Sequence, residues 1–298
     1  MAIDFSIVLC TRNRASLLRE ALDSALEIDY PADRFELVLV DNGSTDATPD
    51  VTRSAADRAP FPLRYVFEPR PGLSIARNRG VRESRGAHVS FTDDDQLVDK
   101  DILREFRRVI DRYSARVVQG NIELRFTGGR PPWLHGELAT VLGKTNDVAE
   151  GPANIDLYGG NMLLSREVLE ATGAFREDLG KGASGYCEDI ELTYRVRQMG
   201  EVIVYAPSAR IYHVIGPDRS TPDFFLRNSF EKGVSYGLLT DASLLRFTAE
   251  RLPTLLRSAG GAAFFSALGN QHRAILAQSR AANMLGMIVG RARQPRRG

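Results

Sequence analysis

The feature that most constrains the fold is a regular alternation, over residues 1–100, of short apolar runs with longer amphipathic segments. The apolar runs have the length and β-branched content of buried strands, and the segments between them have helical spacing. Strands are predicted at Phe5–Cys10, Phe35–Val40, Leu63–Phe67 and Ala87–Thr92, and helices at Ala15–Leu26 and Leu73–Glu83. Such alternation is typical of parallel strands joined by crossover helices. The sequence therefore predicts an α/β fold with a mixed, mostly parallel sheet flanked by helices.

The second half of the chain shows a different pattern. A helix is predicted to about Tyr113 and a strand near 116–124, followed by a glycine- and proline-rich loop at 127–134 that carries the only tryptophan, Trp133. Beyond it, strands are predicted at Leu157–Ser165, Val202–Tyr205 and Ala209–Val214, a helix at Ile190–Met199, and helices alone from about Pro222. We expect one domain over residues 1–220, with halves at 1–100 and 101–220, and a helical C-terminal extension over 221–298.

Charge and cysteine content exclude several classes of partner and environment. The formal net charge is +1, from 39 basic and 38 acidic residues, so there is no bulk positive field to hold nucleic acid. The N-terminus lacks the pattern of a secretory signal, which predicts a cytoplasmic protein. Cys10 and Cys187 are too few for a disulfide scaffold and are predicted to be reduced. The apolar stretch 259–268 is shorter than the ~18 residues that a spanning helix needs.

Polar residues gather directly after the predicted strands. Thr11 to Arg14 follow the first strand, Asp41 follows the second, and Asp93 to Asp95 follow the fourth. In open α/β sheets the ligand crevice lies beyond the carboxyl ends of the strands. Three adjacent carboxylates repel one another unless a cation compensates, and their hard oxygens suit Mg²⁺ or Mn²⁺ with a nucleotide diphosphate as co-ligand. The alternative is a solvated acidic turn that caps the next helix.

A second acidic group, Glu188 and Asp189, stands at the start of the predicted helix that contains Leu192 and Val196. Acidic residues in a first helical turn are common, because they interact favourably with the helix dipole. The functional interpretation is that one carboxylate acts as a general base. The residues alone leave both interpretations open.

Six short motifs, taken together, resemble one known family. They are Thr11-Arg12-Asn13-Arg14, Val40-Asp41-Asn42-Gly43-Ser44-Thr45-Asp46, Ala76-Arg77-Asn78, Phe91-Thr92-Asp93-Asp94-Asp95, Gly159-Gly160-Asn161 and Cys187-Glu188-Asp189. In order and spacing they are similar to the family 2 glycosyltransferases of the GT-A fold, over roughly residues 3–215. The resemblance implies an inverting, metal-dependent transfer of a sugar from a nucleotide-diphosphate donor, with UDP favoured, to an acceptor hydroxyl. Residues 1–100 would then be the nucleotide-binding half and residues 101–220 the acceptor half.

The resemblance also implies roles for particular residues. The nucleotide would be bound by Thr11, Arg12, Arg14, Asp41, Arg77, Asp93 and Asp94, with Asp41 at the base and Arg77 near the diphosphate. The metal, Mg²⁺ or Mn²⁺, would be held by Asp95 and His213, and the donor sugar would face Gly160 and Asn161. Asp189 would be the general base, with Glu188 the first alternative, and Trp133 would either stack on a sugar ring or pack internally. Arg12 departs from the family pattern, in which an aromatic residue often lies beneath the base.

Two rival functions fit part of the pattern. A sugar nucleotidyltransferase also needs a nucleotide and a strand-end metal, but it gives Glu188 and Asp189 no role. A non-catalytic sugar-nucleotide-binding protein would not need every acidic position to be retained. The acceptor class stays open among saccharide, lipid-linked and other hydroxyl compounds.

The C-terminal extension is locally basic, with nine arginines and two acidic residues between Asp241 and Gly298. The arginines are Arg246, Arg251, Arg257, Arg273, Arg280, Arg291, Arg293, Arg296 and Arg297. Basic amphipathic helices bind anionic membrane surfaces, which predicts peripheral attachment to the cytoplasmic face of a membrane. The alternative is a helix face that packs on the catalytic domain or on a second copy of the chain.

Overall fold

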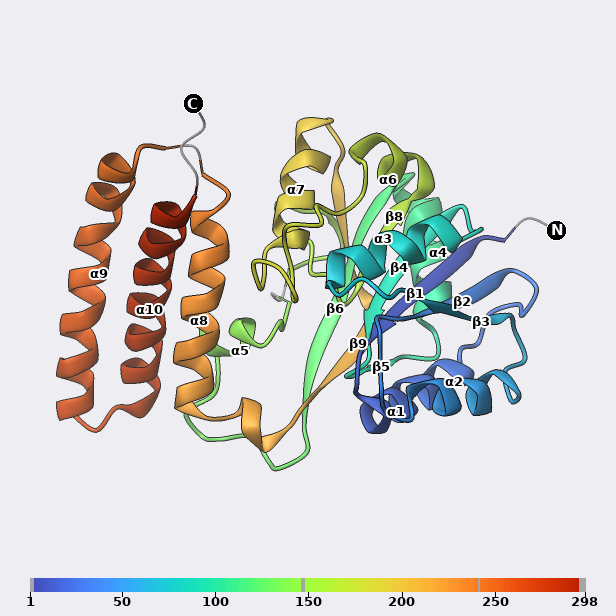
Figure 1. Cartoon of the computed structure of the whole chain (residues 1–298), viewed down its shortest axis with the longest axis horizontal. Coiled ribbons are helices and arrows are strands. Elements are labelled where there is room, and N and C mark those ends of the chain that lie inside the picture. The colour runs from blue at the N-terminus through green and yellow to red at the C-terminus, as the bar shows by residue number, and fades with distance from the viewer. Residues whose placement is uncertain (1–2, 146–147, 241, 295–298) are drawn as a thin grey trace. The chain divides into compact units, whose positions relative to one another are not determined.

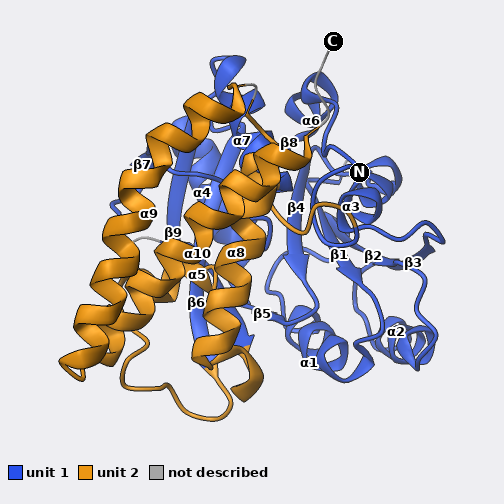
Figure 2. Cartoon of the chain, turned by 60° about the vertical axis from the view of Figure 1, so that its left-hand side comes forward, with its two compact units in different colours: residues 1–125, 144–182, 188–214 blue, residues 126–143, 183–187, 215–298 orange. Residues whose placement is uncertain are grey.

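The computed structural model describes residues 3–145, 148–240 and 242–294, and it divides the chain into two compact units (Figures 1 and 2). The first unit comprises residues 1–125, 144–182 and 188–214, and the second comprises 126–143, 183–187 and 215–298. Arg296 and Arg297 lie outside the described residues. The assignment of separate halves to nucleotide and acceptor stays a prediction.

The first unit begins with four parallel strands joined by helices, as the apolar alternation predicts. The strands are β1 (Phe5–Thr11), β2 (Phe35–Asp41), β3 (Leu63–Phe67) and β4 (His88–Asp93), and the helices are α1 (Ala15–Leu26), α2 (Thr48–Ala56) and α3 (Leu73–Glu83). β1 pairs in parallel with both β2 and β4, and β2 pairs in parallel with β3. The predicted strands and helices of this half are therefore confirmed to within one residue at each end.

Antiparallel strands extend this block into a mixed sheet. They are β5 (Gln96–Val98), β6 (Val117–Phe126), β7 (Gly151–Pro152), β8 (Met162–Ser165) and β9 (Ile203–Ile215), accompanied by α4 (Ile102–Tyr113), α6 (Arg166–Thr172) and α7 (Glu188–Gln198). Among the described residues the order is β3-β2-β1-β4-β8-β6-β9-β5, with β7 beside β9. The predicted mixed sheet flanked by helices is confirmed.

Two predictions for the second half were wrong. The strand predicted at Leu157–Ser165 begins only at Met162, because the backbone N–H of Leu157 donates to Thr193 of α7 instead of to a neighbouring strand. The two strands predicted on either side of Pro207 form the single strand β9. Pro207 lies between the residues of β9 that pair with β7 and those that pair with β5, where a missing N–H is tolerated.

The packing of the core explains why the strands appear in the sequence as continuous apolar runs. Ile7 and Leu9 belong to one buried cluster, and Val8 and Cys10 belong to another. Successive side chains of a strand point to opposite faces of the sheet, so both faces of β1 are buried. Polar residues are therefore accommodated where the strands end, and this places the candidate site. Cys10 and Cys187 are both buried, and neither forms a disulfide within the described residues.

The second unit is helical from η1 (Pro217–Arg219) onward, and it also holds the short helix α5 (Glu137–Val141). Its long helices are α8 (Pro222–Gly237), α9 (Leu244–Ala267) and α10 (Gln271–Arg293). α8 and α10 pack closely through glycines, namely Gly233, Gly237, Gly286 and Gly290, at each of which a methyl group would overlap a carbonyl oxygen of the facing helix. Within the described ranges no helix is both long and apolar enough to cross a membrane.

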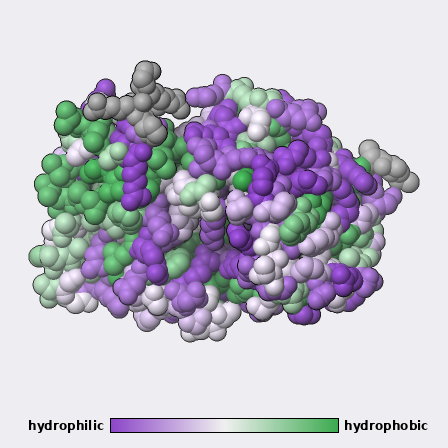
Figure 3. Space-filling view, in the orientation of Figure 1, coloured by the Kyte–Doolittle hydropathy of each residue, from purple (hydrophilic) through white to green (hydrophobic). Residues whose placement is uncertain are grey.

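One face of α9 is apolar and exposed along its whole length. We call this face the α9 stripe, and it consists of Leu245, Ala249, Leu252, Leu256, Ala259, Ala263 and Ala267. These residues recur at intervals of three or four, so they share one side of the helix. Leu245 is 86% exposed and Leu256 is 62% exposed. Figure 3 shows apolar residues gathered over the left-hand part of the surface, where Figure 1 places α9.

Candidate active site

The strand register brings the predicted polar residues to one edge of the sheet. Thr11 pairs with Asp41 across β1 and β2, and Cys10 pairs with Asp93 across β1 and β4. Thr11, Asp41 and Asp93 are the last residues of their strands. Because parallel strands end at the same edge, these side chains share the crevice position that binds ligands in open α/β sheets.

Arg14 supplies positive charge to the aspartate triplet in this structure. Its guanidinium donates to Asp94 and, at 3.1 Å, to Asp95, and Thr11 Oγ1 donates to Asp94 Oδ2 at 2.8 Å. Burial raises the pKa of Asp94 to about 6, the neighbouring charge of Asp95 adds to this, and Arg14 and Thr11 oppose it. A ligand cation at this position would therefore share the carboxylates with Arg14.

The structure places the two predicted metal ligands next to each other. His213 Nε2 lies 3.6 Å from Asp95 Oδ1, because β5 and β9 pair so that Gln96 lies opposite His213 and Val214 N donates to Asp95 O. Both side chains are buried. No group of three or more His, Cys, Asp or Glu residues is arranged to hold a metal within the described ranges. The Asp95 carboxylate nevertheless fits Mg²⁺ or Mn²⁺, which take most of their remaining ligands from water and phosphate, whereas the His213 imidazole is a ligand that softer transition metals prefer.

Arg77 connects the triplet to the second acidic group. Its side chain is 3% exposed, and it donates to Glu188 Oε1 at 2.7 Å and to Asp93 Oδ1 at 3.0 Å. Gly159 lies against the guanidinium, where a Cβ atom would come within 2.6 Å of both terminal nitrogens. A side chain at position 159 would therefore displace Arg77 from the two carboxylates. This gives a steric reason for the first glycine of the Gly159-Gly160 pair.

The acidic pair at the start of α7 contains two carboxylates in different surroundings. Burial raises the pKa of Glu188 to about 7, the adjacent Asp189 adds to this, and Arg77 opposes it. Asp189 is partly exposed, and its Oδ2 accepts from Gly159 N at 3.0 Å while its Oδ1 accepts from Ile190 N at 2.8 Å. Each carboxylate oxygen has a second lone pair, so Asp189 is oriented by the backbone and retains the capacity to accept a proton.

The remaining predicted residues lie in varied positions. Asp41 is fully buried, and its carboxylate accepts from Ser44 N at 2.8 Å and from the Tyr65 hydroxyl at 2.7 Å. Arg12 is exposed. Asn161 is fully buried and donates to the carbonyls of Asn121 and Ala209, while its Oδ1 has no hydrogen-bond partner within the described part of the chain.

Two further placements bear on the donor-sugar and stacking predictions. Gly160 lies against the Gln96 amide, so closely that a Cβ atom would overlap it. Trp133 lies in the second unit, is 8% exposed, and packs edge-on against Phe225 with ring centroids 5.3 Å apart. Of the two interpretations of Trp133, this contact favours internal packing.

Sequence reasoning assigned no role to three residues that shape the site. Gln96 accepts hydrogen bonds from Thr92 Oγ1 and Asp93 N, Tyr65 donates to Asp41, and Gly159 holds Asp189 and makes room for Arg77. Gln96 directly follows the aspartate triplet, and its position alone could have drawn attention to it. Tyr65 carries no such signal, because it is part of a strand separated from Asp41 by α2.

Comparison with solved structures identifies the fold to which this sheet order belongs. The mannosyltransferase PcManGT from Pyrobaculum calidifontis, solved with GDP-Man and Mn²⁺, aligns over 98% of this chain and 87% of that chain, with a TM-score of 0.65 and 22% identity. TarS 1–349 of S. aureus, solved with UDP-GlcNAc, aligns over 99% of this chain and 93% of that chain, with a TM-score of 0.56 and 18% identity. The fold is the GT-A glycosyltransferase fold.

The sequence itself identifies the family. Residues 6–173 match Glycosyl transferase family 2, and the chain belongs to this family of glycosyltransferases. The succinoglycan biosynthesis protein ExoM of Rhizobium meliloti is 25% identical over 240 residues, which are 80% of this chain and 75% of ExoM. Glycosyltransferase AglE of Haloferax volcanii is 23% identical over 67% of this chain and 64% of AglE. The predicted family is therefore confirmed.

Proposed function

We propose that the protein transfers a sugar from a nucleotide-diphosphate donor to an acceptor hydroxyl with inversion at the anomeric carbon. The observation that carries the proposal is the continuous set of contacts that joins Asp189 through Gly159 to Arg77, and Arg77 through Asp93 to the strand-end triplet. This set combines a candidate base with the positive charge that a diphosphate leaving group requires. A nucleotidyltransferase would leave Asp189 without a role.

Asp189 takes the proton in the proposed step. The acceptor oxygen forms a bond to the anomeric carbon, its proton passes to the Asp189 carboxylate, and the bond to the diphosphate breaks with the electron pair leaving on the diphosphate. Attack opposite the leaving group inverts the configuration without a covalent enzyme intermediate. Gly159 N–H and Ile190 N–H orient Asp189 for this role.

The leaving diphosphate is stabilised by cationic groups. Carboxylates hold Arg77 and Arg14 at the strand ends. With the donor bound, both guanidinium groups would also interact with the diphosphate oxygens. A Mg²⁺ or Mn²⁺ ion bound by Asp95 and His213 would supply further positive charge there. Thr11, Asp41, Asp93 and Asp94 would line the nucleoside side of the crevice, and Gly160 and Asn161 the sugar side. Buried charges act strongly because little water screens them.

We favour a UDP-sugar as the donor and a glycan or lipid-linked saccharide as the acceptor. A TarS structure holds UDP-GlcNAc, whereas the PcManGT structure holds GDP-Man, so the shared fold accommodates both nucleotides. The name of ExoM, a succinoglycan biosynthesis protein, supports a place in polysaccharide biosynthesis.

Incubation with UDP- and GDP-sugars, Mn²⁺ and candidate acceptors tests this proposal. We expect release of the nucleoside diphosphate and a glycoside product of opposite anomeric configuration to the donor, read by NMR of the new linkage. Retention of configuration would reject the single displacement, and binding without turnover would indicate a binding protein. Formation of UTP or GTP and a sugar 1-phosphate when pyrophosphate is added would indicate a nucleotidyltransferase. Turnover of GDP-sugars alone would overturn the preference for uridine.

We further propose that the second unit binds an anionic membrane surface through the α9 stripe. The stripe offers an uncharged apolar face, and Arg246 and Arg257, both exposed, lie beside it on the same helix. Apolar insertion together with basic residues is the combination by which amphipathic helices hold to anionic lipid. Each basic residue near the surface contributes about 1 kcal/mol, an amount that salt reduces.

Vesicle co-sedimentation of the full chain tests this proposal. Leu252→Glu with Leu256→Glu should abolish binding to anionic vesicles, because it puts two charges into the apolar face. Val202→Glu is the matched control, since Val202 is also exposed at 55% but lies in the first unit. High salt should weaken wild-type binding. Equal binding by both variants would contradict the proposal, and a shift from dimer to monomer without any lipid effect would assign the stripe to a second copy.

A further inference from the structure

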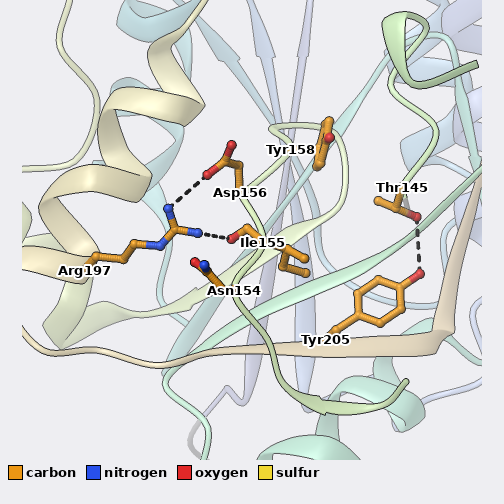
Figure 4. Close-up of a pocket in the computed structure, with 7 residues that line it drawn as sticks. All are labelled: Thr145, Asn154, Ile155, Asp156, Tyr158, Arg197 and Tyr205. Atoms are coloured by element: carbon orange, nitrogen blue, oxygen red, sulfur yellow. Dashed lines mark hydrogen bonds and ion pairs between the residues drawn. The ribbon is translucent and has the colours of Figure 1, made fainter. Parts of the chain in front are cut away.

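The first unit contains a polar cavity of about 290 Å³ that the proposed step does not use. Asn154, Asp156 and Tyr158 line it from the loop between β7 and β8, Arg197 lines it from α7, and Tyr205 lines it from β9 (Figure 4). The volume lies just below the range for small-molecule sites, which begins at ~300 Å³. A single sugar ring suits this size better than an extended ligand.

The walls of the cavity are fixed by contacts within the first unit. Arg197 donates to Asp156 Oδ1 at 3.1 Å and to Ile155 O at 2.7 Å, and the Tyr158 backbone N–H donates to Gln119 Oε1 at 2.7 Å. The hydroxyls of Thr145 and Tyr205 lie 3.3 Å apart. Figure 4 shows Arg197 reaching from its helix toward Asp156, with Tyr158 on the other side of Asp156. A pre-formed wall of this kind binds ligand without a large ordering cost.

Polar groups of the lining retain hydrogen-bonding capacity. In the part of the chain that the structure describes, the Tyr158 hydroxyl and the Asn154 amide have no hydrogen-bond partner. Asp156 uses one carboxylate oxygen for Arg197. The charges of Asp156 and Arg197 offset each other, so the cavity favours a neutral ligand that both donates and accepts hydrogen bonds. Sugar hydroxyls have this character.

The chain connects the cavity to the candidate base through Tyr158 and Gly159. Tyr158 directly precedes Gly159, whose N–H donates to Asp189 Oδ2 at 3.0 Å. Burial raises the pKa of Tyr158, and the negative charges of Asp156 and Asp189 add to this effect. Tyr158 therefore lines the cavity and also interacts electrostatically with the candidate base, Asp189.

We propose that this cavity is an acceptor subsite that binds one neutral hexosyl residue, next to the residue whose hydroxyl is presented to Asp189. Tyr158 Oη, the Asn154 amide and Asp156 would hydrogen-bond the ring hydroxyls, and the Tyr158 ring would contact the apolar face of the sugar. The inference rests on the proposed function, because it assigns the acceptor side of the same reaction. It also specifies the acceptor as an uncharged saccharide.

The test separates binding from turnover. Binding of the methyl glycosides of glucose, galactose, mannose, N-acetylglucosamine and glucuronic acid to the full chain, without donor, is measured by saturation-transfer NMR titration. We expect at least one neutral glycoside to bind, and Tyr158→Phe and Asn154→Ala each to weaken it roughly five-fold, as loss of one hydrogen bond predicts. Tyr194→Phe is the matched control, because Tyr194 is an exposed tyrosine of α7 outside the cavity.

Three outcomes would overturn the inference: no binding of any glycoside, variants that bind as the wild type does, or preference for the glucuronide. Each variant is first shown to retain the wild-type circular dichroism spectrum and melting temperature. Hydrolysis of the donor by wild-type protein without acceptor is measured separately. Such hydrolysis would support the proposed function independently of the cavity, whereas absence of nucleoside diphosphate release with every donor and acceptor tested would count against that function. Glycoside binding reports on the cavity alone.

Discussion

Asp189→Asn is expected to lower the rate of sugar transfer by ~10²–10⁴-fold, the contribution of a positioned general base. Asparagine has nearly the same shape as aspartate, and its amide oxygen can still accept from Gly159 N. It does not take up a proton at neutral pH, so the attacking hydroxyl would lose its base. Donor binding should stay close to that of the wild type, because in the described part of the chain Asp189 forms no hydrogen bond to Arg77 or to the triplet.

The measurement is kcat for transfer together with the Kd for the donor, from titration calorimetry. Glu188→Gln is the informative partner variant, since Glu188 is buried and bonded to Arg77. It should disturb donor binding through Arg77 more than Asp189→Asn does. A wild-type kcat in Asp189→Asn, with a large loss in Glu188→Gln, would transfer the role of base to Glu188.

Removal of the metal is expected to abolish turnover, and Asp95→Asn is expected to reduce metal affinity by at least ~10–100-fold. Outer-shell substitutions at metal sites already cost that much, so loss of a direct carboxylate ligand should cost no less. Asp95 lies in a loop at the end of a strand, and Arg14 keeps its contact with Asp94, so the fold should persist. EDTA should stop the reaction, and Mn²⁺ or Mg²⁺ should restore it.

Metal-dependent nucleotide binding is measured by calorimetry with UDP and Mn²⁺. This measurement tests whether Asp95 binds the ion specifically or whether acidic surface residues attract it in general. Asp111→Asn is the matched control, because the Asp111 side chain is 65% exposed on α4 and lies in the same unit. It should bind as the wild type does. Full activity in EDTA would reject metal dependence, and unchanged metal affinity in Asp95→Asn would place the ion elsewhere.

The local pattern of the sequence was sufficient for the first half of the fold. β1 and β2 are apolar on both faces, so their runs are unambiguous, and α1 and α3 were predicted with their observed bounds. The pattern failed at residues 157–161, which are apolar in part but hydrogen-bond to α7. It also failed at residues 206–208, which were left between two predicted strands but are part of the single strand β9. In both places tertiary hydrogen bonding outweighs the local signal.

By itself the sequence determined that polar residues stand at the ends of buried strands, and hence which edge of the sheet carries the candidate site. Hydrophobic periodicity is a local property, so it can be read without knowing the partners. Only the tertiary structure decided which side chains meet: Arg14 with Asp94 across 80 residues, and Arg77 with Glu188 across 111. Those contacts depend on how α1, α3 and α7 pack on the sheet. No spacing within one segment encodes them, because each partner is fixed by a different part of the core.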